Sequence, residues 1–326
     1  MHFELTADQT ALQEGMRNFC SGRFGIDAVR VLADTGGIDR AAWRELADMG
    51  VFALRLPEKD GGVELGWADS VLVFEELGRA LVPGPIVWSH LAAGLVDGAS
   101  TGDVIVGGVE RDDPSMLVEY FDHLDQVLVM DEDGVWLVPT KGLEALSVAT
   151  PLDPLTPVSR LSKPFPKGDQ VVDAEGARAM RVQGAALVAG LCLGLAQGST
   201  TLAVAYAQER VQFDKPIGAF QAVKHLLADM FTRSEVARGA VYAAGVTLDD
   251  PGVGSLERAV AGAKLTAAEA AVGNGKSCIQ VHGGMGYTWE VDAHLFFKRA
   301  YALEPLFGSR EECATTMAEL LEASLT

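Results

Sequence analysis

Residues 278–299, CIQVHGGMGYTWEVDAHLFFKR, place a glutamine, a histidine, a glycine pair, aromatic rings and acids between two helical patterns. Gly283, Gly284 and Gly286 interrupt the helical period, so backbone N–H groups there lack helical partners and can face a ligand. A glycine pair before a helix also suits a plain interhelical turn. The spacing alone leaves both interpretations open.

Residues 209–230, ERVQFDKPIGAFQAVKHLLADM, join a loop to a helix that we expect to begin near Phe220. Arg210 at the start of the loop offers a planar fork of donors that suits a phosphate. An exposed ion pair with Glu209 or Asp214 is the alternative for this arginine. His225, like His282, fits a structural histidine better than an acid or base.

Together the two segments resemble the C-terminal signature of acyl-CoA dehydrogenases. The matching positions are Arg210, Gln212, Phe213, Phe220, Gln221, 227–230, Gln280, Gly283, Gly284, Gly286 and Tyr287. The resemblance is clear over residues 178–326, fair over 1–90 and poor between them. It implies an FAD whose pyrophosphate and adenosine end is bound across a subunit interface by Arg210, Gln212, Phe213, Gln221, Gln280, Val281, Gly283 and Gly284.

The family's reaction removes a proton α to a CoA thioester carbonyl and therefore needs a carboxylate base. In most members the base is the Glu of a Tyr-Glu-Gly element, and the family spacing here lands on Phe307. In a minority it lies on the first bundle helix, at the position that corresponds to Gly184. Neither residue accepts a proton. Glu304 and Glu290 are displaced candidates, and a solvated or ion-paired acid is the competing interpretation for each.

Three further positions depart from the family pattern. Asp214 stands where the family has a glycine, which puts an acid near the expected phosphate contact. Ser309 and Glu311 stand where the family has a threonine and a glutamine that touch the flavin. The ring-facing loops of the family's β-domain have no counterpart that we can find in the short middle section.

Composition restricts the partners. The chain of 326 residues has 45 acidic and 26 basic side chains and a formal charge of −19, so nucleic acid is not an expected partner. Four cysteines without paired spacing indicate free thiols, and no metal-type spacing is present. The longest apolar run, residues 185–196, is too short for a membrane span. With no signal-peptide pattern at residues 1–9, we expect a cytoplasmic protein.

The elements that would position these residues are mostly helices. Thr6 and Gln9 have the spacing of a capping box, which predicts a helix from about Ala7. Further helical patterns cover residues 38–49, 67–81 and 87–96. We expect Glu75 and Glu76 within them to lie on a solvated helix face.

After residue 100 the pattern changes to short β-rich runs, with the clearest hairpin at 127–130 and 135–138. Helical patterns then return and predict an antiparallel bundle, whose small residues would let helices approach closely. Its segments are 178–209, 219–248, 254–281, 288–303 and 310–324.

The predicted fold is therefore acyl-CoA dehydrogenase-like and mainly α. We expect an N-terminal helical domain at 1–98, a shortened β-rich domain at 99–175 and a helical bundle at 176–326. By resemblance, the chain is a base-lacking short subunit that supplies FAD contacts to a full-length acyl-CoA dehydrogenase subunit in an α2β2 heterotetramer, as in actinobacterial steroid catabolism. The acyl-CoA would then lie mainly in the partner, with electron-transfer flavoprotein as acceptor. A self-sufficient homo-oligomeric enzyme and a flavin-free scaffold of the same fold are the alternatives.

Overall fold

The computed structural model describes residues 4–111 and 116–325, and it gives side-chain positions up to residue 323. The chain forms two compact units. One comprises Met1–Ile26, Trp67–Val82 and Ala185–Thr326, and the other comprises Asp27–Gly66 and Pro83–Gly184. The predicted division at residues 98 and 175 is not tested by these units and stays a prediction.

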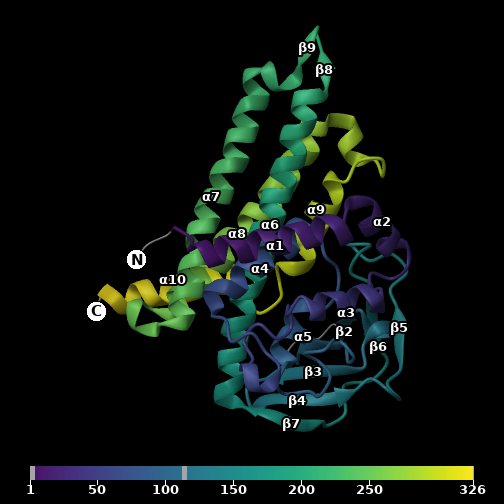
Figure 1. The fold of residues 1–326 in the computed structure, drawn as a ribbon, viewed down its shortest axis with the longest axis vertical. Helices are drawn as coiled ribbons and strands as arrows, with labels where there is room; N and C mark the ends of the chain where they lie inside the picture. Colours follow the sequence, from purple (N-terminus) through teal and green to yellow (C-terminus); the bar gives the residue numbers. More distant parts are fainter. Residues whose placement is uncertain (1–3, 112–115, 326) are drawn as a thin grey trace. The chain divides into compact units, whose positions relative to one another are not determined.

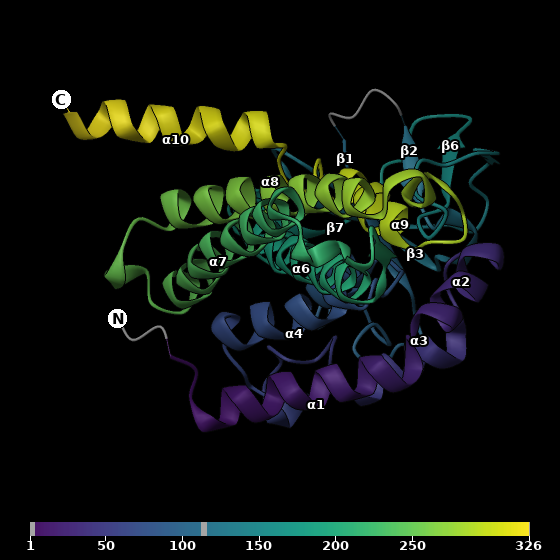
Figure 2. The same ribbon diagram turned by 90° about the horizontal axis from the view of Figure 1, so that it is seen from above.

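The first unit is a helical bundle. Its long helices α6, α7 and α8 run side by side, and α10 lies along α8 (Figures 1 and 2). Short strands β8 and β9 join α6 to α7 at one end of the bundle (Figure 1). The bounds are α1 Ala7–Arg23, α4 Trp67–Arg79, α6 Ala174–Glu209, β8 Val211–Gln212, β9 Lys215–Pro216, α7 Gln221–Asp249, α8 Leu256–His282, α9 Ala293–Leu303 and α10 Arg310–Leu325.

Local sequence signals set several of these ends. The Thr6 hydroxyl accepts from the Gln9 N–H at 3.1 Å, and the Gln9 side chain accepts from the Thr6 N–H at 3.1 Å. This confirms the predicted capping box, which satisfies two of the N–H groups that a helix start leaves free. At the start of α8 the Ser255 hydroxyl plays the same capping role for Arg258.

Helices α4 and α6 pack closely because glycines face each other across the contact. A methyl group on Gly194 would lie 1.9 Å from the Glu75 carbonyl oxygen, and one on Gly78 would lie 2.1 Å from the Leu191 carbonyl oxygen. Gly190 is similarly tight, with 3.0 Å to the Val71 carbonyl oxygen. The Gly-rich run in α6 therefore permits close helix approach, as the sequence predicted.

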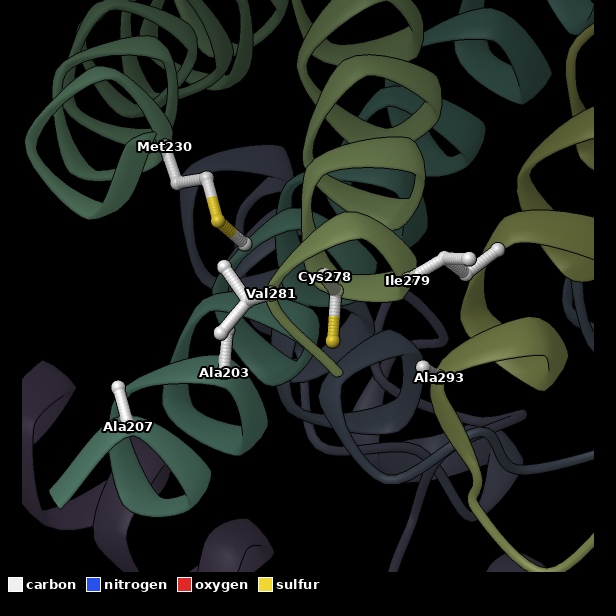
Figure 3. Packing of buried hydrophobic residues seen from close by; sticks show 7 residues of the cluster. All are labelled: Ala203, Ala207, Met230, Cys278, Ile279, Val281 and Ala293. Atoms are coloured by element: carbon white, nitrogen blue, oxygen red, sulfur yellow. The ribbon is translucent and has the colours of Figure 1, made fainter. Parts of the chain in front are cut away.

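A cluster of apolar side chains packs inside the bundle (Figure 3). It takes residues from four helices, and its buried members are Ala203, Ala207, Met230, Cys278, Ile279, Val281 and Ala293. The small side chains of Ala203, Ala207 and Ala293 leave room for the larger Met230, Ile279 and Val281, so the four helices pack without polar groups between them.

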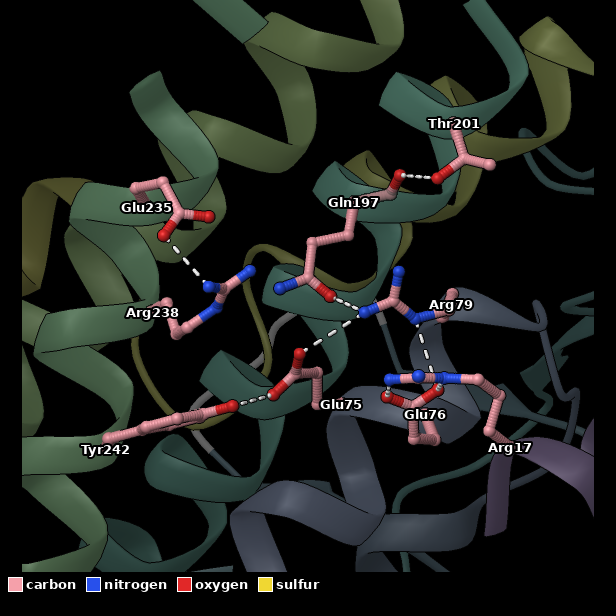
Figure 4. A network of polar contacts seen from close by, with 9 residues as sticks. All are labelled: Arg17, Glu75, Glu76, Arg79, Gln197, Thr201, Glu235, Arg238 and Tyr242. Carbon is pink, nitrogen blue, oxygen red and sulfur yellow. Dashed lines mark hydrogen bonds and ion pairs between the residues drawn. The ribbon is translucent and has the colours of Figure 1, made fainter. Parts of the chain in front are cut away.

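A polar network lies between α1, α4, α6 and α7, and it corrects one expectation (Figure 4). Glu75 and Glu76 are each only 1% exposed, so the prediction of a solvated helix face was wrong. Arg17 binds both oxygens of Glu76, at 2.8 and 3.0 Å. Tyr242 donates to Glu75 at 2.8 Å, and Arg79 binds both glutamates. The two acids are buried because arginines from two helices neutralise them.

Within the described residues, the second unit contains the strands of the middle section, three α-helices and the N-terminal part of α6. One sheet has the order β1-β3-β4-β7 and the other β2-β6-β5, and α5 lies against β1. The bounds are α2 Ile26–Asp34, α3 Arg40–Asp48, α5 Ile86–Ala92, β1 Val106–Glu110, β2 Leu117–Glu119, β3 Gln126–Asp131, β4 Gly134–Pro139, β5 Ala145–Ser147, β6 Val158–Leu161 and β7 Asp169–Asp173.

The predicted hairpin is confirmed, with β3 and β4 antiparallel and Asp131 opposite Gly134. The sequence did not reveal that β1 pairs with β3 in parallel, and it gave no sign of α2. The mainly α fold with a small strand region agrees with the prediction.

Candidate functional site

The first motif forms a tight hairpin after α6. Arg210 leaves the helix with its N–H on the Tyr206 carbonyl at 2.8 Å, and its own carbonyl accepts from Ile217 at 2.8 Å. Phe213 and Asp214 form the turn, with φ of +53° and +61°. A two-residue turn with both φ values positive matches the twist of a hairpin, and aspartate tolerates this conformation better than most residues. This explains how Asp214 replaces the family's glycine.

The hairpin presents its side chains to solvent. Arg210, Gln212 and Gln221 are exposed, and Phe213 is 85% exposed. Phe213 touches Phe220 edge-on, with ring centroids 6.0 Å apart. Gln221 is the first residue of α7, whose N-cap Phe220 makes no side-chain cap hydrogen bond.

The second motif terminates α8. Gly283 has φ of +60°, a conformation that favours glycine, and its N–H donates to the Gln280 carbonyl. Methyl groups on Gly283 and Gly284 would meet nothing within 4 Å, so this backbone is open to a ligand. Gly286 differs, since a methyl group there would lie 2.4 Å from the Ile279 carbonyl oxygen. Gln280 is exposed, whereas Val281 is buried in the apolar cluster and contributes packing.

One ring contact joins the two motifs. Tyr206, one turn before Arg210, stacks on His282, the residue before Gly283, with centroids 4.2 Å apart and planes at 26°. The sequence predicts a structural role for His282 and no particular role for Tyr206. Their positions immediately beside the two motifs were the only available signal.

The first motif is less acidic than the chain as a whole. Residues 209–230 contain three basic side chains, Arg210, Lys215 and Lys224, and three acidic ones, Glu209, Asp214 and Asp229. All six are exposed, and Lys215 lies over the Phe220 ring at 4.4 Å. In a protein of formal charge −19, these exposed cations together with the N–H groups at the start of α7 suit an anion.

The loop around Phe307, where the family spacing predicts the base, is closed. Phe307 is 3% exposed and has φ of +56°. Lys264, which is fully buried, donates to the carbonyls of Glu304, Leu306 and Gly308 at 2.8, 2.9 and 2.8 Å. Three carbonyl dipoles thus solvate the buried ammonium and fix the loop in one shape. The sequence had not drawn attention to this lysine.

The displaced acids occupy different environments. Glu304 Oε1 accepts from the Arg310 N–H at 2.7 Å and from its Nε at 3.3 Å, so it is the ion-paired acid that the sequence left as an alternative. Glu290 is exposed before α9. Gly184 is buried within α6, in the second unit.

Ser309 caps α10 through reciprocal hydrogen bonds with Glu312, at 2.7 and 3.2 Å, and Glu311 is exposed in the first turn of that helix. These contacts give Ser309 a structural role.

The four cysteines are buried and free. Burial raises the pKa of Cys20 and of Cys278 to about 12 and that of Cys192 to about 11, so these thiols stay protonated. Within residues 4–111 and 116–325, no group of three metal-ligating side chains gathers. Helix α6 is long and apolar enough to span a membrane, but 78% of its apolar window is buried in the protein, as in a core helix.

Sequence comparison defines the class. The model of the acyl-CoA dehydrogenase C-terminal domain matches residues 177–321, and that of the N-terminal domain matches residues 6–100. The chain therefore belongs to the acyl-CoA dehydrogenase family. Acyl-CoA dehydrogenase IpdE2 of Mycobacterium tuberculosis is 32% identical, covering 94% of each chain. Acyl-CoA dehydrogenase FadE34 of the same organism is 33% identical over 98% of this chain, which spans only 49% of that relative's length.

Solved structures show the same fold. The ChsE4-ChsE5 complex from Mycobacterium tuberculosis contains a chain with a TM-score of 0.84 and 23% identity, and the match covers 99% of both chains. A Tcur3481-Tcur3483 steroid ACAD variant also gives 0.84, at 22% identity, over 98% of this chain and 99% of that one.

Proposed function

We propose that this chain is the base-lacking subunit of an FAD-dependent acyl-CoA dehydrogenase that introduces an α,β double bond into a CoA thioester. It pairs with a full-length subunit in an α2β2 heterotetramer. Its own contribution to the reaction is a set of contacts to the adenosine and pyrophosphate end of the partner's FAD. The observation that carries the proposal is the contrast between a buried phenyl ring at Phe307, where the base is expected, and an open half-site with exposed basic side chains at Arg210.

The base position argues for dependence on a partner. Phe307 is buried, and the Lys264 hydrogen bonds hold the backbone on either side of it. A phenyl ring cannot take the α proton. Glu304, the nearest displaced acid in the sequence, already accepts two hydrogen bonds from Arg310. An acid held in this way is poorly suited to serve as a base, which weighs against the self-sufficient enzyme.

The half-site argues for a retained flavin contact. Exposed Arg210, Lys215 and Lys224 complement a dianionic pyrophosphate, and the open backbone at Gly283 and Gly284 allows close approach. Exposed Phe213 offers an aromatic face beside them. When bound, FAD would accept the hydride that leaves the β carbon. A flavin-free scaffold would not explain this basic, solvent-facing set.

The substrate class is proposed by analogy. A structural neighbour described as a steroid ACAD and another described as a complex of two named chains share this fold. We infer a CoA thioester of a steroid-derived acid, bound mainly by the partner, with electron-transfer flavoprotein as the acceptor and the cytoplasm as the compartment.

Substitution of Arg210 tests the half-site. In the assembled complex, Arg210→Ala should lower FAD occupancy and activity together, because a charge-assisted phosphate contact is worth about 1.5–3 kcal/mol. Arg44→Ala is the matched control, since its partner Asp103 lies at 3.3 Å and both side chains are more than half exposed in the other compact unit. Equal flavin content in the wild type and the Arg210 variant would contradict the proposed contact.

Activity of the chain purified alone separates the alternatives. We expect little dehydrogenase turnover on any acyl-CoA without the partner. Robust turnover that is lost in Glu304→Gln or Glu290→Gln would instead establish a self-sufficient enzyme. If the partner subunit holds as much FAD without this chain as it does in the assembled complex, the result would favour the flavin-free scaffold.

A further inference from the structure

We propose that the stacked rings of Tyr206 and His282 position Arg210 relative to the Gly283–Gly284 backbone, so that both can contact one anion. This inference rests on the proposed function, because it assigns positioning residues to the same half-site. Neither ring is proposed to touch the ligand.

The first link runs from Arg210 to Tyr206. The Arg210 N–H donates to the Tyr206 carbonyl at 2.8 Å, which continues the last turn of α6. On its other side the Arg210 carbonyl accepts from Ile217 at 2.8 Å. The arginine backbone is therefore fixed by the end of α6 and by the strand that returns from the turn.

The second link is the ring contact between helices. The Tyr206 and His282 rings lie 4.2 Å apart at 26°, in a nearly parallel stack. The His282 Nδ1 donates to the Cys278 carbonyl at 2.8 Å, which fixes the imidazole plane. His282 is 4% exposed, so this orientation is also held by packing. Any tilt of α6 against α8 would have to break the stack.

The third link is covalent. Gly283 follows His282 directly and ends α8 with φ of +60°. The open backbone of the second motif therefore begins one residue after His282, and Arg210 lies one helical turn after Tyr206. The Arg210 side chain is long and flexible. If it and the Gly283–Gly284 backbone are to contact the same pyrophosphate, the backbone must be held at a fixed separation between the two places.

The test is a double-mutant cycle on the full chain, with ADP as the probe for the adenosine and pyrophosphate end of FAD. Binding is measured by ligand-observed NMR, which detects millimolar affinities and does not require turnover. We expect Tyr206→Leu to weaken ADP binding about tenfold in the native background and less than twofold in the Arg210→Ala background, because positioning residues act through the arginine. Tyr206→Phe keeps the stack and should stay within about twofold of the native chain.

A second variant protects the test against simple unfolding. His282→Leu removes the stack from the other helix and should show the same non-additive pattern, with thermal unfolding followed for each variant. The positioning role would be overturned if Tyr206→Leu and His282→Leu weakened ADP binding by the same factor in the native and Arg210→Ala backgrounds, or did not weaken it at all. Either result would leave the proposed half-site intact. If the native chain does not bind ADP, or Arg210→Ala does not weaken it, both this inference and the proposed half-site fail.

Discussion

Lys264 is the residue on which the closed loop most depends. Its ammonium is fully buried and its three donors are used by three carbonyls between Glu304 and Gly308. Because the α9–α10 connection includes two consecutive residues with positive φ, Phe307 and Gly308, its shape needs outside support. The lysine supplies that support from α8.

We therefore expect Lys264→Met to destabilise the protein by about 3 kcal/mol or more, since it leaves buried carbonyls without a donor. Lys276→Met on the same helix is the control, because Lys276 is exposed and its replacement should change stability by less than about 0.5 kcal/mol. Chemical denaturation of both variants measures the difference. Equal stability would mean that water replaces the ammonium at these carbonyls.

Glu75 gives a pH dependence with a defined sign. Burial raises its pKa above 4.5, although the Tyr242 hydroxyl, Gln197 and Arg79 oppose the shift. A carboxyl with a higher pKa in the folded state than in the unfolded state adds to the free energy of unfolding at low pH, where it is protonated in both states. This contribution is lost as the pH rises through the pKa of the folded state. The free energy of unfolding should accordingly lose this term as pH increases above 4.5.

Glu75→Gln isolates that term, because the amide keeps the shape and does not titrate. We expect the stability of the wild type relative to Glu75→Gln to fall between pH 4.5 and neutral pH in urea titrations. Parallel curves for the wild type and Glu75→Gln would show that the buried carboxyl keeps its ordinary pKa.

At the scale of elements, the contact between α4 and α6 depends on glycine. The methyl group of Gly194→Ala would lie 1.9 Å from the Glu75 carbonyl oxygen and 2.5 Å from the Arg79 nitrogen. Backbone atoms on both sides cannot move aside as the end of a flexible side chain would, so the helices must separate. The same separation would disturb the Glu75 and Arg79 side chains of the polar network.

We expect Gly194→Ala to destabilise the protein by about 3 kcal/mol or more. Gly15→Ala in α1 is the matched control, because nothing lies within 4 Å of the added methyl group. That change should stabilise by about 0.5–1 kcal/mol through lower chain entropy. Thermal unfolding of both variants gives the comparison, and a stable Gly194→Ala protein would show that the two helices can shift apart cheaply.

At the scale of the whole molecule, the proposed assembly fixes a stoichiometry. In the proposed assembly each flavin takes ring-facing loops from one subunit and adenosine contacts from another, and we propose that this chain supplies only the second. We expect one FAD per heterodimer. Quantifying released FAD against each polypeptide measures this ratio, and two flavins per heterodimer would show that this chain also holds a flavin of its own.

The sequence alone determined the structural features that depend only on residues close together along the chain. The Thr6–Gln9 capping box, the glycine that ends α8 and the β3–β4 turn are set within a few residues, and each was predicted. The two family motifs, and the prediction that Phe307 stands where the family has its base, likewise come from residue type and spacing, and the family that the motifs indicated is confirmed.

Only the tertiary structure decided which polar groups are buried and what they meet. Glu76 looked solvated because its arginine partner Arg17 lies 59 residues away in the sequence and reaches it only after α1 packs on α4. Lys264 and the loop that it fixes are about forty residues apart, and Tyr206 and His282 are further still. Such pairs form because helices pack side by side, and helical periodicity specifies which face is buried but not which helix covers it.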